Sequence, residues 1–458
     1  MSSDDSPGEK SQAKASNAEN VEDNRRRRPT RPSSQDSNGS SPPGPPKKKQ
    51  KTLKNQEKTE EEPLLRATKE ICRPGAPAET ERQELEYPDR YSPPPRLDDE
   101  AGYYTYVCGE NLSPRYKILS KLGEGTFGMV LECWDRITKD YVAAKVIRNI
   151  DKYRRAAMIE LEVLNTLEKN DTEGKRHCIS LQRWFDYRGH VCMVFDRLGP
   201  SLFDFLQING YRPFDISKVQ QFGQQIFEAV AYMHELSLIH TDLKPENILL
   251  EKNGYKRCSS SPASSVGARS AKRVPISSNV KVIDFGSATF NESYHSHIVS
   301  TRHYRAPEII LGHGWSFPCD IWSVGTILVE LITGETLFHT HENLEHLAMM
   351  EQVLGPIPES MSKKCNRQTE KYFVRGRLNW PEGAQSRKNI RSVRSLLKLK
   401  ALIHELGDKS VRPHLDLFLD LVGKMLCYEP SKRITAREAL KHEFFKTPIC
   451  GNTWPTEA

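Results

Sequence analysis

The spacing of apolar residues divides the chain into two halves of different character. From Tyr116 to about Val194, short runs alternate apolar with polar residues, as β-strands do. The stretch DKYRRAAMIELEVLNTLEKN interrupts these runs and predicts one helix. Its expected apolar face consists of Ala156, Ile159, Val163 and Leu167. This half therefore predicts a small strand-rich unit with a single helix.

Helical patterns dominate from Ser201 onward, and KVQQFGQQIFEAVAYMHEL is an example. The chain therefore predicts an α+β fold with two lobes. The small β-rich N-lobe is expected at residues 116–195 and the larger α-helical C-lobe at residues 199–445. A cleft between two such lobes is the expected ligand site.

Three segments depart from this globular pattern. Residues 1–100 are rich in Ser, Pro, Glu, Lys and Arg, with no aromatic residue before Tyr87. Such a segment buries too little apolar area to offset its chain entropy, so we expect a disordered tail. Residues 251–278 form a Ser-rich insert without periodicity, and a loop of this length is either functional or disordered. Residues 446–458 are a short C-terminal extension.

Composition narrows the class of protein. No apolar stretch approaches the roughly 18 residues of a membrane helix, so no membrane association is expected. The start, MSSDDSPGEK, has no apolar region of the kind that a secretory signal needs. The ten cysteines include no CxxC pair, which argues against a structural zinc site or a disulfide framework. We therefore expect a reducing compartment.

Charge adds a hypothesis about location. The net charge of +7 is small for 458 residues and indicates a mixed-charge surface rather than direct nucleic-acid binding. The tail, however, contains two basic runs, RRRRPTR at 25–31 and PPKKKQK at 45–51. Such runs predict nuclear import, or an RNA contact through the tail; solvated runs without a role are the alternative.

The first motif with chemical meaning is LGEGTFGMV, Leu122 to Val130. Its Gly123, Gly125 and Gly128 match G-x-G-x-x-G, in which small residues let the backbone approach phosphate groups. A dinucleotide-binding turn shares this core but opens into a helix. Here strand-like residues follow, which favours a glycine-rich hairpin over the phosphates of a nucleotide.

A lysine and a glutamate come next. Lys145 lies in the apolar strand YVAAKVI, where a buried ammonium group needs a partner. The predicted helix supplies Glu160, with Glu162 as a competing candidate. A lysine that contacts phosphate oxygens and is held by a glutamate is an arrangement that phosphoryl transfer uses.

Two acidic motifs complete the pattern. In IHTDLKPEN, Asp242 can accept the proton of an attacking hydroxyl, Lys244 can neutralise the transferred phosphoryl group, and Asn247 can hold a second magnesium ion. In VKVIDFGSA, Asp284 follows a short apolar strand, and its carboxylate can bind the magnesium ion that bridges the phosphates. The element TRHYRAPE follows and ends at Glu308.

These five motifs, in this order, resemble the protein kinases over residues 116–445. The string ENLEHLAMMEQVLGPIP further resembles the signature of the LAMMER (CDC-like) dual-specificity kinases, and PRYKILSKLGEGTFG is most similar to their plant members. The resemblance implies a two-lobed kinase fold that uses ATP and Mg²⁺ to phosphorylate serine, threonine and, in autophosphorylation, tyrosine. It implies Arg/Ser-rich splicing factors as substrates. The expected location is the nucleus, with the cytoplasm as a second location, and the expected state is a monomer.

The resemblance also assigns roles to residues. Phe195 would guard the back of the ATP pocket, and Asp196 to Leu198 would form the hinge to adenine. Asp320 would brace the catalytic loop, Arg433 would pair with Glu308, and the insert would carry a hairpin. The remaining ATP contacts would come from Leu122, Val130 and Ala143.

Thr241 stands where most kinases have an arginine that pairs with a phosphate on the activation loop. We therefore predict an enzyme that is active without an upstream kinase, with autophosphorylation at Ser300 or Thr301 as a weaker hypothesis. A pseudokinase scaffold is disfavoured because the lysine, base and metal-binding residues are present; a kinase for other substrates stays open. Asp204 and Asp215 are candidate contacts to substrate arginines.

The LAMMER string itself predicts a packed helix rather than a chemical site. One helical stripe contains Leu344, Leu347, Met350 or Glu351, and Leu354.

Overall fold

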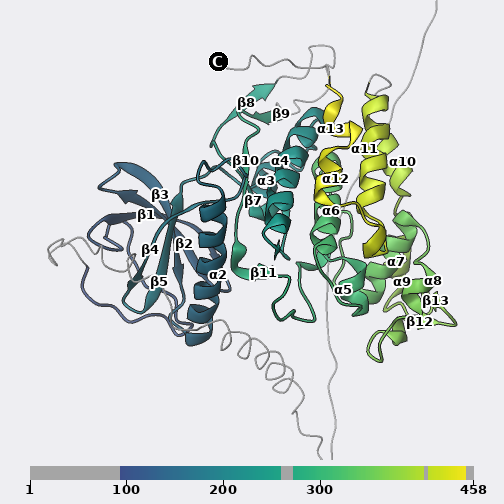
Figure 1. The fold of residues 1–458 in the computed structure, drawn as a ribbon, viewed down its shortest axis with the longest axis horizontal. Coiled ribbons are helices and arrows are strands. Elements are labelled where there is room, and N and C mark those ends of the chain that lie inside the picture. Colours follow the sequence, from purple (N-terminus) through teal and green to yellow (C-terminus); the bar gives the residue numbers. More distant parts are fainter. Residues whose placement is uncertain (1–92, 259–271, 407–410, 450–458) are drawn as a thin grey trace, which may run out of the picture. The chain divides into compact units, whose positions relative to one another are not determined.

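The computed structural model describes residues 93–258, 272–406 and 411–449, all within one compact unit, Gln56–Ala458. The N-lobe is a five-stranded antiparallel sheet in the order β1-β2-β3-β5-β4, with one helix, α2 (Figure 1). The elements are β1 (Tyr116–Gly125), β2 (Gly128–Asp135), β3 (Asp140–Ile147), α2 (Asp151–Asn170), β4 (Leu181–Tyr187) and β5 (His190–Asp196).

The two faces of this sheet have different roles, which follow from the alternation of side chains along a strand. One face is fully buried in a small core of its own that includes Leu131, Val142, Ala144 and Val146. On the opposite face, Val130, Ala143 and Lys145 are only partly buried. The sheet therefore keeps a row of accessible side chains on the face that carries the predicted lysine.

The described segment before β1 packs against the buried face of the sheet. Tyr104 and Leu112 belong to the small core, and Leu112 is fully buried. Asp98 Oδ1 lies 2.9 Å from Nε2 of the buried His190, and Arg188 donates to the Pro94 carbonyl at 3.2 Å. Residues 93–100, which were predicted as part of the tail, therefore contact the N-lobe, and residues 101–115 add to the core of its sheet. Residues 1–92, with both basic runs, lie outside the described residues.

Helix α2 begins and ends where the sequence predicts, but its buried face is rotated. Val163 and Leu167 are buried, whereas Ala156 and Ile159 are only partly buried. The other buried residues of α2 are Ala157, Glu160, Leu161 and Leu164. The helix contacts strands β3, β4 and β5 and also the C-lobe turn η3 (Phe285–Ser287), so it buries two sides rather than one stripe.

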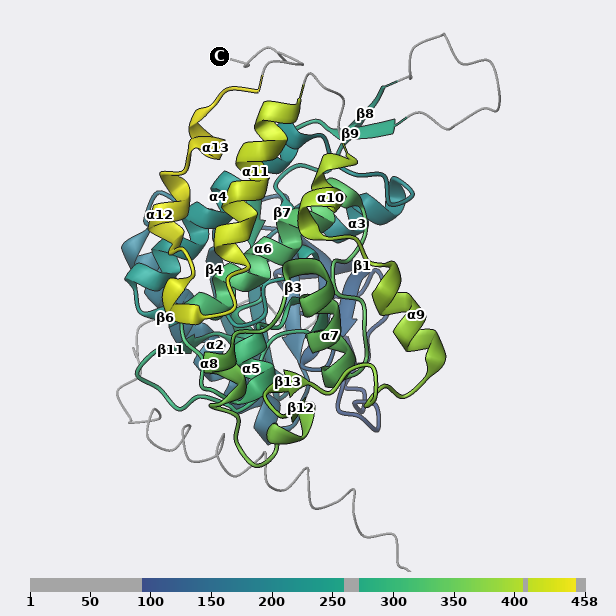
Figure 2. The same cartoon turned by 90° about the vertical axis from the view of Figure 1, so that its right-hand side faces the viewer.

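The C-lobe is mainly helical and is built around α6 (Figures 1 and 2). Its larger helices are α3 (Leu202–Ile208), α4 (Ile216–Glu235), α6 (Pro318–Thr333), α7 (Asn343–Leu354), α9 (Arg387–Ser395) and α11 (Arg412–Met425). Its shorter helices are α5 (Pro307–Leu311), α8 (Glu359–Ser362), α10 (Leu399–His404), α12 (Ala436–Leu440) and α13 (Glu443–Lys446). Its short strands are β6 (Leu238–Ile239), β7 (Ile248–Leu250), β8 (Tyr255–Cys258), β9 (Lys272–Pro275), β10 (Val280–Val282), β11 (Thr289–Phe290), β12 (Phe373–Val374) and β13 (Arg377–Leu378).

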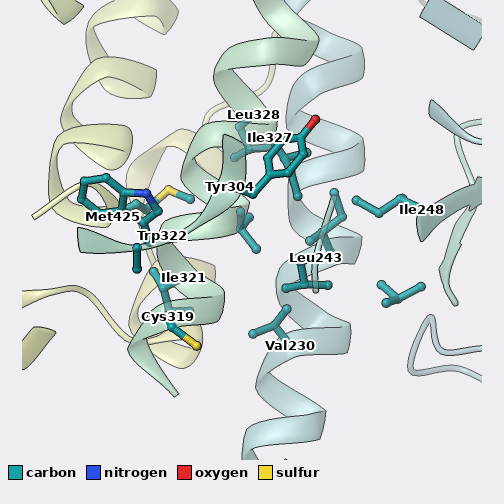
Figure 3. Close-up of a cluster of buried hydrophobic side chains, with 14 of the residues drawn as sticks. Val230, Leu243, Ile248, Tyr304, Cys319, Ile321, Trp322, Ile327, Leu328 and Met425 are labelled. Carbon is teal, nitrogen blue, oxygen red and sulfur yellow. The ribbon is translucent and has the colours of Figure 1, made fainter. Parts of the chain in front are cut away.

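Helix α6 is buried from Cys319 to Ile332. In Figure 3, Trp322 of α6 lies beside Met425 of α11. Ile327 of α6 and Tyr304 lie on the side of α6 that is nearer to Leu243. Contacts on both sides hold α6 in place. A helix packed this densely resists displacement, so it is a rigid support for whatever is bonded to it.

Helix α7 carries the LAMMER string and is buried on most of its surface. Leu344, Leu347 and Met350 are buried, as the stripe predicts, and Leu354 is partly buried. His346, Ala348, Met349 and Val353 are buried as well. The string therefore has a packing role. Within the described residues, no helix is long and apolar enough to cross a membrane.

The described ends of the insert form the hairpin that the resemblance implies. Strands β8 and β9 pair antiparallel, with Tyr255 opposite Pro275 and Arg257 opposite Arg273. The guanidinium group of Arg273 lies 4.8 Å from the centre of the Tyr255 ring, and such cross-strand contacts are invisible to periodicity. Residues 259–271 lie outside the described residues.

The role of the segment before β1 can be tested with two leucines from that segment. Leu112→Ala should lower the free energy of unfolding by about 2–4 kcal/mol, because it leaves a cavity beneath the sheet. Leu97 is 91% exposed, so Leu97→Ala is the matched control and should change stability little. Urea unfolding followed by fluorescence measures both. Equal midpoints for the two variants would show that the segment does not stabilise the sheet.

Candidate active site

The glycine-rich motif forms the hairpin between β1 and β2, with Gly125 opposite Gly128. The three glycines serve two purposes. A Cβ atom on Gly128 would lie 2.2 Å from the Val146 carbonyl oxygen, so strand packing requires glycine there. A Cβ on Gly123 or Gly125 would meet no atom within 4 Å, so these two leave open space for a ligand to approach the backbone. The Tyr103 hydroxyl holds the hairpin by donating to the Gly125 carbonyl at 2.7 Å.

The lysine of β3 and the glutamate of α2 form a buried ion pair. Lys145 Nζ lies 2.7 and 2.9 Å from the two carboxylate oxygens of Glu160, and 3.1 Å from Asp284 Oδ1. Glu162 is exposed, so Glu160 rather than Glu162 is the partner of Lys145. Burial alone would lower the pKa of Lys145, but the carboxylates of Glu160 and Asp284 raise it. The lysine is therefore a fixed cation on the accessible face of the sheet.

The predicted base is held as an ionised carboxylate. Asp242 Oδ2 accepts a hydrogen bond from Lys244 Nζ at 2.6 Å, and the Asn247 amide donates to the Asp242 carbonyl at 3.0 Å. Burial alone would raise the pKa of Asp242, but the hydrogen bonds from Lys244 and Thr301 hold it below its ordinary value. Three of the predicted residues thus lie together in one loop between β6 and β7.

The catalytic loop is fixed from below by α6. Asp320, fully buried, accepts hydrogen bonds from the backbone N–H groups of His240 and Thr241, both at 2.9 Å. Another buried pair lies further along: Arg433 donates to both carboxylate oxygens of Glu308, at 2.7 and 2.9 Å. The structure therefore contains both contacts that the resemblance implies.

Thr241 joins three parts of the C-lobe. Its N–H donates to Asp320, its Oγ1 donates to the Ser287 carbonyl at 2.8 Å, and its own carbonyl accepts from Ser300 Oγ at 2.6 Å. Its φ of 67° is unfavourable for a β-branched residue, so the bonds must hold it there. The residue that looks anomalous in the sequence therefore ties the catalytic loop to both ends of the activation segment.

Thr301 has a role that sequence reasoning missed. Its N–H and Oγ1 both donate to Asp242 Oδ1, at 2.8 and 2.7 Å, and its Oγ1 accepts from Lys244 at 3.2 Å. A phosphate on Thr301 would place negative charge beside the carboxylate of Asp242. Together with the bond from Ser300 to Thr241, this argues against the autophosphorylation hypothesis for these two residues.

The remaining predicted residues outline a nucleotide site. In the sheet register Val130 pairs with Lys145, and Ala143 pairs with Phe195. Phe195 and Leu198 are buried, whereas Leu122 is 40% exposed on β1. The hinge is joined to β2 because Arg197 Nε donates to Glu132 at 2.9 Å.

Asp284 and Asn247 are suited to hold Mg²⁺ beside bound phosphates. Asp284 has a φ of 63° and a side chain that is 39% exposed. The Asn247 amide nitrogen is bonded within the loop, which leaves its oxygen as a possible ligand. No group of three or more His, Cys, Asp or Glu side chains within the described ranges could hold a metal ion. One carboxylate and one amide suit Mg²⁺, which commonly takes its other ligands from phosphates and water.

Two glutamates near the base were not predicted: Glu246, which is partly buried, and Glu330, which is buried. Glu246 Oε2 is buried and has no hydrogen-bond partner in the described part of the chain, and burial raises the pKa of Glu246. Burial raises the pKa of Glu330 to about 7, and the charge of Glu246 adds to this rise. Tyr304 donates to Glu330 at 2.8 Å. A lone acid in the apolar run DIWSVGTILVELIT was the signal that could have revealed Glu330.

The acidic residues that sequence reasoning proposed for substrate arginines have other partners. Asp204 caps α3 by accepting from the backbone and side chain of Ser201, and Asp215 pairs with Lys272 of the insert at 2.7 Å. Asp204 therefore stabilises the start of α3, and Asp215 binds a lysine of the insert. Glu246 and Glu330 replace them as candidates.

The comparisons with known proteins agree with this geometry. A family model described as "Protein kinase domain" matches residues 116–445. The chain is 56% identical to the serine/threonine-protein kinase AFC3 of Arabidopsis thaliana over 357 residues, which cover 78% of this chain and 88% of AFC3.

More distant relatives match as well. The chain is 47% identical to the human dual specificity protein kinase CLK2 over 353 residues, 76% of this chain and 67% of CLK2. It is 46% identical to the dual specificity protein kinase lkh1 of Schizosaccharomyces pombe over 360 residues, 78% of this chain and 51% of lkh1. Among solved structures, the kinase domain of PF14_0431 matches with a TM-score of 0.69 and 38% identity, covering 76% of this chain and 100% of that one.

The ion pair on α2 can be tested with neighbouring glutamates. Glu160→Gln should reduce kcat/KM for phosphoryl transfer about a hundredfold, because Lys145 loses the carboxylate that orients it. Glu162→Gln is the matched control and should keep activity near that of the wild type, since Glu162 is exposed on the same helix. Steady-state kinetics with nucleotide and a peptide acceptor measure both. Equal losses in the two variants would contradict the assigned pair.

Proposed function

The chain belongs to the protein kinases and is of the LAMMER type, and on this basis we propose that it phosphorylates serine and threonine within arginine-rich segments. The substrates proposed are Arg/Ser-rich splicing factors, whose phosphorylation would regulate splicing of pre-mRNA in the nucleus. The two basic runs of the tail support a nuclear location. The names of lkh1 and CLK2 as dual specificity kinases support additional action on tyrosine.

The geometry supplies each part that phosphoryl transfer needs. Asp242 is held ionised and accepts the proton of the attacking hydroxyl. Lys145, oriented by Glu160, holds the phosphates of ATP, and Lys244 neutralises charge on the transferred group. When bound, Mg²⁺ at Asn247 and Asp284 neutralises further phosphate charge. These residues also disfavour a pseudokinase, because none of the catalytic groups is missing.

The unpartnered acid beneath the site carries the proposal of an arginine-rich substrate. Glu246 follows Lys244 by two residues, and its buried Oε2 lacks a hydrogen-bond donor in the described part of the chain. Leaving a buried carboxylate oxygen unpaired is unfavourable. Glu330 adds a second carboxyl group whose pKa the charge of Glu246 helps to raise. A substrate guanidinium would supply the missing donors and relieve the repulsion between the two acids.

The state and the regulation of the enzyme are also proposed. We propose that the enzyme is a monomer. We also infer that it needs no upstream kinase, because hydrogen bonds of unmodified Thr241, Ser300 and Thr301 hold the activation segment. RNA binding through the tail is a separate hypothesis that concerns residues outside the described ranges.

A peptide comparison at two pH values tests the arginine site. With a pKa of about 7, Glu330 is mostly protonated at pH 6 and mostly ionised at pH 8. The preference for a peptide with an arginine before the target serine over its alanine analogue should therefore grow between pH 6 and pH 8. We expect about a tenfold gain in the ratio of kcat/KM values, which report the ionisation of the free enzyme.

Glu330→Gln should abolish that pH dependence, and Glu246→Gln should reduce the preference for arginine at both pH values. Glu251→Gln is the control variant, because Glu251 directly follows β7, the strand into which the same loop leads. A peptide array should show the same use of arginine with the wild type and no signal with Asp242→Asn. A requirement for proline after the target serine, with no preference for arginine, would contradict the splicing-factor proposal and favour other substrates.

A further inference from the structure

Helix α9 presents a row of arginines to solvent. Its inward side carries Val393, which is buried, while Arg387, Arg391 and Arg394 are exposed. These three arginines are four and three residues apart, so they lie on one face of the helix. We refer to them as the arginine row.

The arginine row has no counter-charge of its own. Within the described residues, no ion pair or hydrogen bond of these three side chains is found. The surrounding sequence does not supply acids either, since residues 359–400 contain twelve Lys and Arg residues against three Glu. A surface with one sign of charge attracts ligands of the opposite sign. The row is therefore available to an anionic partner.

The arginine row begins near the substrate side of the C-lobe. Arg302 of the activation segment donates to the Asn343 side chain at the start of α7. Gln385, two residues before the row, is bonded to Glu342, which directly precedes α7. At the other end, Gln352 near the end of α7 donates to the Leu396 carbonyl just after α9, at 3.0 Å. Helix α9 thus runs along the outer side of α7, leading away from the activation segment (Figure 2).

The chemistry of arginine points to phosphate. Guanidinium groups bind phosphate oxygens in pairs, with better geometry than lysine offers. The rise of an α-helix places Arg387 and Arg391 about 6 Å apart along the axis. Every second residue of an extended peptide repeats at about 6.8 Å, so two alternate phosphoserines would meet Arg387 and Arg391.

Phosphorylation changes the sign of the proposed substrate. An unmodified Arg/Ser segment is cationic and is repelled by the row. Each phosphoserine adds a charge of about −1.5 to −2, so a phosphorylated segment becomes anionic. The helix RKNIRSVRS contains no aromatic residue on which a base could stack, which favours a phosphopeptide over single-stranded RNA.

We propose that the arginine row is a docking site for phosphoserine-rich peptide segments. The identity of the occupant rests on the proposed function, because the segment is the enzyme's own phosphorylated substrate. The row holds the completed part of a long substrate while the next serine enters the active site. It therefore acts on the number of phosphates added to one chain, not on the transfer of a single phosphate.

Binding without ATP tests the docking site directly. A fluorescent Ser-Arg repeat peptide, synthesised with and without phosphoserine, is titrated with the full chain and followed by anisotropy. The phosphorylated peptide should bind, and the triple variant Arg387→Gln, Arg391→Gln, Arg394→Gln should weaken its binding at least about tenfold. That factor corresponds to about 1.4 kcal/mol, within the range of three exposed ion pairs.

A matched control keeps the change in charge but moves it elsewhere. Lys117, Lys169 and Lys441 are exposed residues outside α9 and outside the active site. Their triple replacement by Gln should leave binding unchanged. Equal binding by the arginine variant and the wild type would overturn the proposal. So would tighter binding of an RNA oligonucleotide than of the phosphopeptide with the same dependence on the row, which would make the row an RNA site.

A second readout separates docking from the proposed function. The arginine variant should phosphorylate a peptide with one serine at the wild-type rate, which also shows that it is folded. On a long Ser-Arg substrate it should stop at fewer phosphates per chain, as mass spectrometry counts them. Full phosphorylation by the variant would contradict docking. Failure of the wild type to use any Ser-Arg substrate would instead contradict the proposed function, and the anisotropy result would still decide the binding site.

Discussion

The carboxylate of Asp320 is the contact on which the rest of the active site depends. A buried carboxylate is unfavourable unless hydrogen bonds compensate for its lost hydration, and here the N–H groups of His240 and Thr241 do so. Because α6 is buried along its length, this contact transfers the rigidity of the core to the catalytic loop. Thr241 is thereby fixed in an unfavourable backbone conformation, from which it bonds to Ser287 and receives a bond from Ser300. The base, the activation segment and the core are thus one connected unit.

The distribution of charge separates chemistry from recognition. Charges that take part in phosphoryl transfer are paired within the protein, as Lys145 is with Glu160 and Asp242 is with Lys244. Two other sets have no partner among the described residues: the free oxygen of Glu246 beside the site, and the arginine row on α9. Their opposite signs suit one substrate at two stages, a cationic segment before reaction and an anionic one afterwards. The proposed arginine site and the proposed docking site therefore depend on one property, the sign of the charge on the substrate before and after phosphorylation.

Sequence patterns predicted those parts of the structure that depend on residues close together in the chain. The range of α2 and the order of the five motifs could be read directly, because helix periodicity and the residue types of a phosphate site lie within short windows. The position of Tyr104 and Leu112 could not, since their partners are strands elsewhere in the chain. The rotated face of α2 has the same origin, because the helix packs on the sheet and on η3 at once. The hydrogen bonds from Thr301 to Asp242 could not be predicted, because the sequence does not indicate which acceptor a threonine hydroxyl will bond.

Hydrogen bonds between unmodified residues assemble the active site. The most direct measurement is the kinase activity of full-length protein made in bacteria and treated with phosphatase, with mass spectrometry to verify that Ser300 and Thr301 carry no phosphate. We predict that kcat on an arginine-containing peptide stays within about threefold of that of the untreated enzyme, a difference of under about 1 kcal/mol in barrier height. Loss of essentially all activity, restored by phosphorylation of the activation segment, would show that unmodified residues do not assemble the active site.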